Sequence, residues 1–130
     1  MNGSTRLPTG TVTFLFTDIE GSTQLLHRLG DAFIDLNDRH LAIVRTVILD
    51  AGGTIVRTEG DGFFAAFPSA PAAVEAAAAG QRALAEQSWP EDVSVAVRMG
   101  LHTGAGRLGG DDYVGMDVVR AARIANAAHG

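Results

Sequence analysis

The feature that most constrains the fold is a pair of short apolar runs separated by only three residues. TIVRT at 54–58 and GFFAAF at 62–67 both have the composition of β-strands, and Glu59-Gly60-Asp61 lies between them. A connection this short joins antiparallel neighbours, so the two runs predict a β-hairpin with an acidic turn. The fold must accommodate this hairpin in the middle of the chain.

Helical and strand-like segments flank the hairpin on both sides. They follow in this order: a buried strand at 11–16, helical spacing of apolar residues over 31–50, an alanine-rich helix that ends near 86, an alternating strand at 93–101, a glycine-rich loop at 104–110 and a helix at about 117–127. The order β-α-β-β-α-β-loop-α predicts an α+β fold, a ferredoxin-like split βαβ sandwich.

The composition excludes several classes of protein. The length of 130 residues fits one domain, and the absence of cysteine excludes disulfides and thiolate metal sites. A net charge of −5 disfavours nucleic acid as a partner, and no run approaches the ~18 apolar residues of a membrane span. Residues 1–10 lack the apolar core of a signal peptide. We therefore expect a cytoplasmic protein with a disordered leader at 1–9 and one domain at 10–130.

A second informative stretch is FLFTDIEGST at 14–23, where a buried strand ends on Asp18. In a split βαβ sheet the first strand lies centrally and the hairpin packs beside it, so Asp18 and Asp61 are expected to meet at one edge. Two neighbouring carboxylates repel each other unless a cation or a proton lies between them. Oxygen ligands without a nearby histidine favour Mg²⁺ or Mn²⁺ over zinc.

The residues after Asp18 add an anion site to this edge. The amides of residues 20–23 lie at a predicted helix start, where N–H groups and the helix dipole attract phosphate. A metal beside a phosphate cradle indicates a nucleoside triphosphate as ligand. The alternative is purely structural, with Asp18 as a turn or cap residue and Asp61 as a residue of the hairpin turn, since acidic residues are common in turns.

Several segments in the same order resemble one known family. FTDIEGST, RTEGDGFFAAF, RMGLHTG, DDYVG and RAARIANAAHG are similar to segments of the class III nucleotidyl cyclases, and most of all to the catalytic domains of actinobacterial adenylate cyclases. The similarity extends from about Gly10 to Gly130. It implies conversion of ATP to 3′,5′-cyclic AMP and pyrophosphate, with two Mg²⁺ or Mn²⁺ ions per site and sites formed between two chains of a homodimer.

The resemblance also implies roles for individual residues. Asp18 and Asp61 match the two metal-binding aspartates, and Ile19 matches the residue whose backbone carbonyl binds one metal. The residues that match the segment holding the β- and γ-phosphates are Gly21, Ser22 and Thr23. Asp112 matches the acceptor of the adenine 6-amino group, and Arg123 matches the arginine that stabilises charge on the reacting phosphate. From the residue type alone, Arg123 would be a solvated residue on a helix face.

Two positions depart from the family pattern. Arg57 stands where the family has an adenine-selecting lysine, and a forked, planar guanidinium is not equivalent to an ammonium at a tight purine edge. Val119 stands where the family places an asparagine that orients the ribose, and valine forms no hydrogen bond. The loss of one such transition-state contact costs on the order of 10²-fold in rate.

These departures leave three functional hypotheses. The first is a catalytic, homodimeric adenylate cyclase. The second is a degenerate cyclase homology domain with little or no activity that serves as a nucleotide-binding, dimerisation or regulatory module. The third is a diguanylate cyclase, whose GGDEF signature is absent from the sequence. In the resembling family a further strand and helix follow the segment that ends at Gly130, so the domain is expected to be truncated at its C-terminal side.

Overall fold

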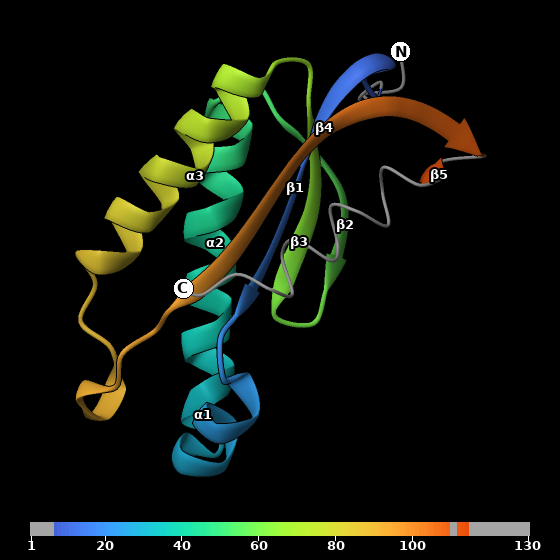
Figure 1. Cartoon of the computed structure of the whole chain (residues 1–130). Helices are drawn as coiled ribbons and strands as arrows, with labels where there is room; N and C mark the ends of the chain where they lie inside the picture. Colours follow the sequence, from blue (N-terminus) through green and yellow to red (C-terminus); the bar gives the residue numbers. More distant parts are fainter. Residues whose placement is uncertain (1–6, 110–111, 115–130) are drawn as a thin grey trace, which may run out of the picture.

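The structure, a computed structural model, describes residues 7–109 and 112–114 (Figure 1). One mixed fold contains a five-stranded sheet in the order β2-β3-β1-β4-β5. The strands are β1 (Gly10–Ile19), β2 (Thr54–Glu59), β3 (Gly62–Phe67), β4 (Val97–Gly109) and β5 (Asp112–Val114). The helices are α1 (Ser22–Leu29), α2 (Ala32–Asp50) and α3 (Ala70–Ala85), with a 3₁₀ turn at Pro90–Asp92.

The central strand is β1, which pairs antiparallel with β3 on one side and β4 on the other. Its apolar residues are buried on both faces of the sheet: Val12 and Phe14 on one face, Leu15 and Ile19 on the other. A strand with this composition is stable only where both faces are covered. The sequence run from 11 to 16 therefore dictates the central position.

The helices cover one face of the sheet, with α2 and α3 packed side by side (Figure 1). Two glycines set their geometry. Gly30, at a positive φ of 56°, ends α1 and allows the chain to turn into α2. Gly80 lets α3 approach α2 and the sheet closely, because a Cβ at that position would lie 3.3 Å from Met99 and from Val47.

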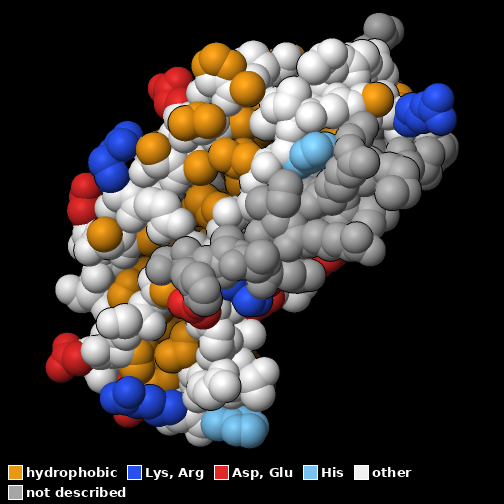
Figure 2. Space-filling model, in the orientation of Figure 1, with side chains coloured by type: hydrophobic (Ala, Val, Ile, Leu, Met, Phe, Trp, Pro, Cys, Tyr) orange, Lys and Arg blue, Asp and Glu red, His pale blue; other side chains and the backbone are white. Residues whose placement is uncertain are grey.

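A second apolar cluster lies on the sheet face opposite the helices. It consists of Val12, Phe14, Phe64 and Ala66, with Leu7, Phe16 and Val56 packed against it. The rings of Phe16 and Phe64 stack with centroids 4.4 Å apart. In Figure 2, hydrophobic side chains gather in a band over the helices, and acidic and arginine side chains line the left edge of the molecule.

The predicted split βαβ fold is confirmed, including the hairpin of β2 and β3 and the central position of β1. Two local predictions are wrong. The strand predicted from residue 93 begins only at Val97, because Val97 pairs with Ile19, where β1 ends, so that the residues before it have no strand pairing with β1. The predicted glycine-rich loop at 104–110 is strand as far as Gly109, because its backbone pairs with β1 and then with β5.

Some predictions concern residues at the ends of the described part of the chain or outside it. The helix predicted at 117–127 and the C-terminal end of the domain lie outside them. Within the predicted leader, Leu7 packs against the second apolar cluster. Among the described helices, none has the length and apolar character that a membrane span requires.

Candidate metal and phosphate site

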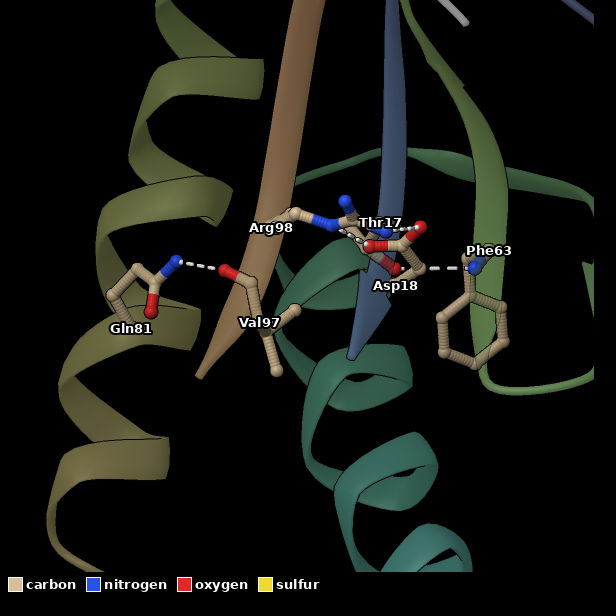
Figure 3. Close-up of polar contacts among 6 residues, drawn as sticks. All are labelled: Thr17, Asp18, Phe63, Gln81, Val97 and Arg98. Carbon is tan, nitrogen blue, oxygen red and sulfur yellow. Dashed lines mark hydrogen bonds and ion pairs between the residues drawn. The ribbon is translucent and has the colours of Figure 1, made fainter. Parts of the chain in front are cut away.

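The end of β1 and the turn between β2 and β3 are in direct contact. The backbone N–H of Phe63 donates to the hydroxyl of Thr17 over 3.1 Å (Figure 3). A Cβ at Gly62 would lie only 1.7 Å from the carbonyl oxygen of Thr17 and 3.1 Å from the Cα of Asp18. The absence of a side chain at position 62 therefore allows Asp61 and Asp18 to reach the same edge of the sheet, as the sequence predicts.

Asp18 is held by an arginine that the sequence patterns do not single out. Arg98 lies opposite Asp18 in the β1–β4 register. Its Nε and Nη2 donate to the two carboxylate oxygens over 2.7 and 2.8 Å (Figure 3). The hydrogen bonds to Asp18 raise the pKa of Arg98 above its ordinary value. The pair is a bidentate ion pair, the strongest geometry that these two groups form.

Asp61 lies in a different environment. Among the residues that the structure describes, its carboxylate accepts no hydrogen bond and forms no ion pair. It lines a pocket of about 320 Å³. The other lining residues are Ser22, Thr23, Leu26, Phe33, Asn37 and Gly60. A pocket of this size is within the range of small-molecule sites.

The start of α1 supplies backbone donors to this pocket. Gly21 precedes the helix with a φ of 67°, a left-handed conformation that favours glycine. No side chain caps the helix, and its first turn contains no acidic residue. The first amides of a helix have no intrahelical acceptor. Since Ser22 and Thr23 line the pocket beside Asp61, the arrangement can accept an anion next to a carboxylate.

The donor set fits a hard divalent cation better than zinc. Asp18 and Asp61 provide carboxylate oxygens, and Ile19, whose side chain is buried, can contribute only backbone. Among the described residues, no group of three or more histidine, cysteine, aspartate or glutamate side chains is placed to hold a metal. A cation here would therefore complete its coordination with water or with phosphate oxygens, which Mg²⁺ commonly does.

Arg57 lies on the sheet face opposite the helices. Its Nε donates to Glu59 over 2.5 Å, and its guanidinium carbon lies 4.6 Å from the centroid of the Phe64 ring. The β2–β3 register shifts between Ile55 and Arg57, a bulge that redirects the side chains which follow. Arg57 therefore faces away from the helices, with its side chain 37% exposed.

The structure does not bring the strand of Asp112 to the edge of the sheet where Asp18 and Asp61 lie. Its strand, β5, pairs with β4 at Gly109, whereas Asp18 pairs with β4 at Arg98. The separation of 11 residues along β4 (109 − 98) corresponds to roughly 35 Å of strand. Arg123 and Val119 lie outside the described residues.

Two residues near the site, Arg98 and His40, could not be identified as site residues from the sequence patterns. Arg98 falls in a predicted strand, but only the pairing register places it opposite Asp18. His40 on α2 is fully buried, and its Nδ1 lies 3.2 Å from Oδ1 of Asn37. Burial lowers the pKa of His40, while Asp61 and, to a smaller extent, Asp18 act to raise it. A fully buried histidine within the field of both aspartates is visible only in three dimensions.

Comparison with curated proteins identifies relatives among cyclases. An adenylate cyclase of Lachancea kluyveri is 34% identical over 95% of this chain, and the match covers 8% of that protein. An uncharacterized protein of Mycobacterium tuberculosis is 36% identical over 95% of this chain and is covered to 41%. The chain thus spans less than a tenth of the fungal relative and about two fifths of the mycobacterial one.

Solved structures and family models agree with these relatives. An adenylate cyclase from Trypanosoma brucei, described in its monomeric state, superposes with a TM-score of 0.88 at 28% identity, covering 99% of this chain and 74% of that one. The family model for the adenylate and guanylate cyclase catalytic domain matches residues 5–129. The chain belongs to this family, the class III nucleotidyl cyclases.

Proposed function

We propose that this domain is an adenylate cyclase that converts ATP to 3′,5′-cyclic AMP and pyrophosphate at sites shared between two chains. The observation that carries the shared site is the distance along β4 between the metal-binding edge and Asp112. One chain presents Asp18 and Asp61 at one end of the sheet and the strand of Asp112 at the other. A two-fold arrangement brings the two ends together and creates two equivalent sites.

Two divalent cations, Mg²⁺ or Mn²⁺, would lower the pKa of the ribose 3′-hydroxyl and neutralise charge on the triphosphate. Asp18 and Asp61 would hold them through carboxylate oxygens, and Ile19 through its backbone carbonyl. The pocket beside Asp61, whose carboxylate has no partner among the residues that the structure describes, supports this assignment. The uncapped start of α1 supports β- and γ-phosphate binding by the backbone amides of Gly21, Ser22 and Thr23.

The second chain would recognise the nucleoside. Asp112 would accept a hydrogen bond from the adenine 6-amino group, a role for which a carboxylate is suited because it is an acceptor only. Arg57 would donate to the base, and Arg123 would stabilise charge on the reacting phosphate. The exposure of Arg57 on the face opposite the helices agrees with contact across an interface. Val119 would contribute only van der Waals contact to the ribose.

The alternative is a cyclase homology domain with little or no activity that binds nucleotide or a second chain. Arg57 favours it, because the guanidinium is already engaged by Glu59 and by the ring of Phe64. An arginine held in this way has to exchange those contacts for the base. The hydrophobic face around Phe16 and Phe64 is compatible with both hypotheses.

One experiment separates the two hypotheses. We expect Mn²⁺-supported formation of cyclic AMP from ATP, with specific activity rising with protein concentration as dimers form. Asp18→Ala and Arg123→Ala should each be inactive. Mixing them creates heterodimers in which one site carries both lesions and the other carries neither, so activity should return. A mixture that stays inactive despite demonstrated heterodimers would exclude the shared site, and an inactive wild type would favour the alternative.

Base selection has its own test. Because Arg57 replaces a lysine of the family, we expect poorer discrimination against GTP than in lysine-bearing relatives. Arg57→Lys should raise the ratio of ATP to GTP turnover, and Glu59→Gln is the control that removes the ion pair to Arg57 without changing Arg57. If Arg57→Lys leaves both the rate and the ratio unchanged, Arg57 does not contact the base.

A further inference from the structure

His40 is a polar residue in a position where an apolar one would pack more simply. It lies on α2 with an exposed fraction of 0%, in the same helix face as the core residues Leu36 and Val44. Its Nε2 is buried and has no hydrogen-bond partner among the described residues. A buried nitrogen without a partner lowers stability, so packing alone does not account for a histidine here.

The other ring nitrogen makes a directed contact. Nδ1 of His40 lies 3.2 Å from Oδ1 of Asn37, one turn earlier on α2. An amide oxygen only accepts hydrogen bonds, so Nδ1 carries the proton and donates it. With the proton on Nδ1, a rotated amide is disfavoured, because it would direct its NH₂ group at the N–H of His40 and its oxygen at the carbonyl oxygen of Gly60.

The oriented amide in turn reaches the hairpin. Nδ2 of Asn37 donates to the carbonyl oxygen of Gly60 over 3.4 Å. Gly60 has a φ of 56° and directly precedes Asp61 in the turn between β2 and β3. Asn37, Gly60 and Asp61 line the same pocket. A continuous path thus leads from the core through one side-chain amide to the backbone beside a metal-binding carboxylate.

We propose that His40 is a positioning residue for the metal site, acting through Asn37 on the turn that carries Asp61. The inference rests on the proposed function, since it assigns Asp61 to a cation. From inside the core, the imidazole holds the Asn37 amide in the one orientation that donates to Gly60. This contact restrains the turn before any ligand enters the pocket.

Two substitutions of His40 separate positioning from packing. In His40→Asn the side-chain NH₂ occupies the place of Nδ1 and still donates to Asn37, whereas His40→Leu fills space without a donor. Removing a residue that holds a metal ligand in place typically lowers the metal affinity 10- to 100-fold. We expect His40→Leu to weaken Mn²⁺ binding about tenfold, measured by electron paramagnetic resonance of free Mn²⁺ with ATP present, and His40→Asn to stay within about threefold of the wild type.

Stability should follow the opposite order. His40→Leu removes an unpaired buried nitrogen and should unfold at the same urea concentration as the wild type or a higher one. His40→Asn leaves a cavity and should unfold at a lower concentration. Metal affinity and stability therefore rank the two variants in opposite directions. If Mn²⁺ affinity follows stability instead, or if His40→Leu binds Mn²⁺ as the wild type does, His40 is only a core residue.

A double-mutant cycle tests the path itself. Asn37→Leu cuts the contact to Gly60, and the double variant with His40→Leu should lose no more Mn²⁺ affinity than Asn37→Leu alone. Additive losses would overturn the relay. A readout without metal separates this inference from the proposed function: the backbone amide resonances of Gly60 and Asp61 should shift in His40→Leu and not in His40→Asn. A wild type that binds no Mn²⁺ contradicts the proposed function, while unmoved resonances in His40→Leu contradict the relay.

Discussion

The end of β1 and the turn between β2 and β3 each bring one carboxylate to the same edge of the sheet, but the two carboxylates differ in charge balance. Both oxygens of Asp18 accept hydrogen bonds from Arg98 at 2.7 and 2.8 Å. Asp61 has no such partner among the described residues and faces a pocket of about 320 Å³. One carboxylate is neutralised within the protein, and the other is open to a ligand.

The difference indicates how two carboxylates can lie at one edge of the sheet when no cation is bound between them. Two ionised carboxylates at one edge repel each other, and a bidentate arginine on one of them removes most of that repulsion. The cost is that a cation must share Asp18 with Arg98 or displace it. The two aspartates are therefore not equivalent ligands, although their places in the sequence motifs suggest a matched pair.

The largest expected effect comes from separating the two regions. In Gly62→Ala the new Cβ would lie 1.7 Å from the backbone oxygen of Thr17, and backbone atoms cannot rotate away. We expect the free energy of unfolding, measured by urea titration, to fall by about 3 kcal/mol or more. Gly60→Ala is the control, because its Cβ meets open space and only the positive φ is strained, at about 1–2 kcal/mol. Equal losses in the two variants would contradict the close contact.

The next effect distinguishes the two carboxylates directly. In the absence of metal, Asp18→Asn leaves Arg98 without its anionic partner and should lower the free energy of unfolding by about 1 kcal/mol, a value that allows for partial exposure. Asp61→Asn should change it by less than about 0.5 kcal/mol, because no described contact is lost. Chemical denaturation in EDTA measures both. Equal destabilisation by the two substitutions would show that Asp18 is not specially held.

The meeting of Asp18 with Asp61 could be predicted from the sequence because it follows from strand periodicity and a three-residue turn. Both are local, and the split βαβ topology converts them into a contact. The pairing of Asp18 with Arg98 could not be predicted, because it depends on the register between β1 and β4, whose paired residues lie 80 positions apart. Arg98 in a strand is ordinary until its cross-strand neighbour is known.

The wrong prediction at 104–110 has a physical reason. Glycines have low strand propensity, so a run rich in glycine favours a loop. Here Gly104 and Gly106 lie opposite Val12 and Gly10 of β1, and that pairing satisfies the backbone. Tertiary pairing thus overrides local preference. His40 is a similar case, because nothing in the local sequence indicates that its ring contacts the side chain of Asn37, three residues earlier on α2.

Removing the charge of Arg98 should abolish the difference between Asp18 and Asp61. Arg98→Met keeps most of the side-chain volume and frees both oxygens of Asp18. We expect Mn²⁺ to bind about fivefold more tightly, since a partly exposed ion pair is worth about 1 kcal/mol. Isothermal titration calorimetry measures the affinity. Arg107→Met, an exposed change of the same charge toward the far end of β4, is the control and should change it less than twofold. Weaker Mn²⁺ binding in Arg98→Met would mean that Arg98 organises Asp18 for the cation.

The smallest effect concerns the charge of His40. Burial lowers its pKa in the folded protein, and Asp61 raises it more than Asp18 does. The unfolded chain therefore takes up a proton near pH 6.5, its ordinary value, while the folded protein does so only at lower pH. Stability is then complete above about pH 6.5 and falls as the pH drops toward the folded pKa, by at most about 1.4 kcal/mol per pH unit.

Comparing the wild type with His40→Leu isolates this contribution, because the carboxylates titrate in both proteins. The difference in free energy of unfolding between the two should change from pH 7.5 to pH 5.5 in favour of the leucine variant. The pKa of His40 also compares the electrostatic effects of Asp18 and Asp61. Since Asp61 raises the pKa of His40 more than Asp18 does, Asp61→Asn should lower that pKa further than Asp18→Asn in a titration of the ring by nuclear magnetic resonance. Because Asp18→Asn also leaves Arg98 without its anionic partner, the two substitutions are compared in the Arg98→Met background. If Asp18→Asn has the larger effect there, Asp18 and not Asp61 is the stronger charge at His40, which contradicts the order expected here.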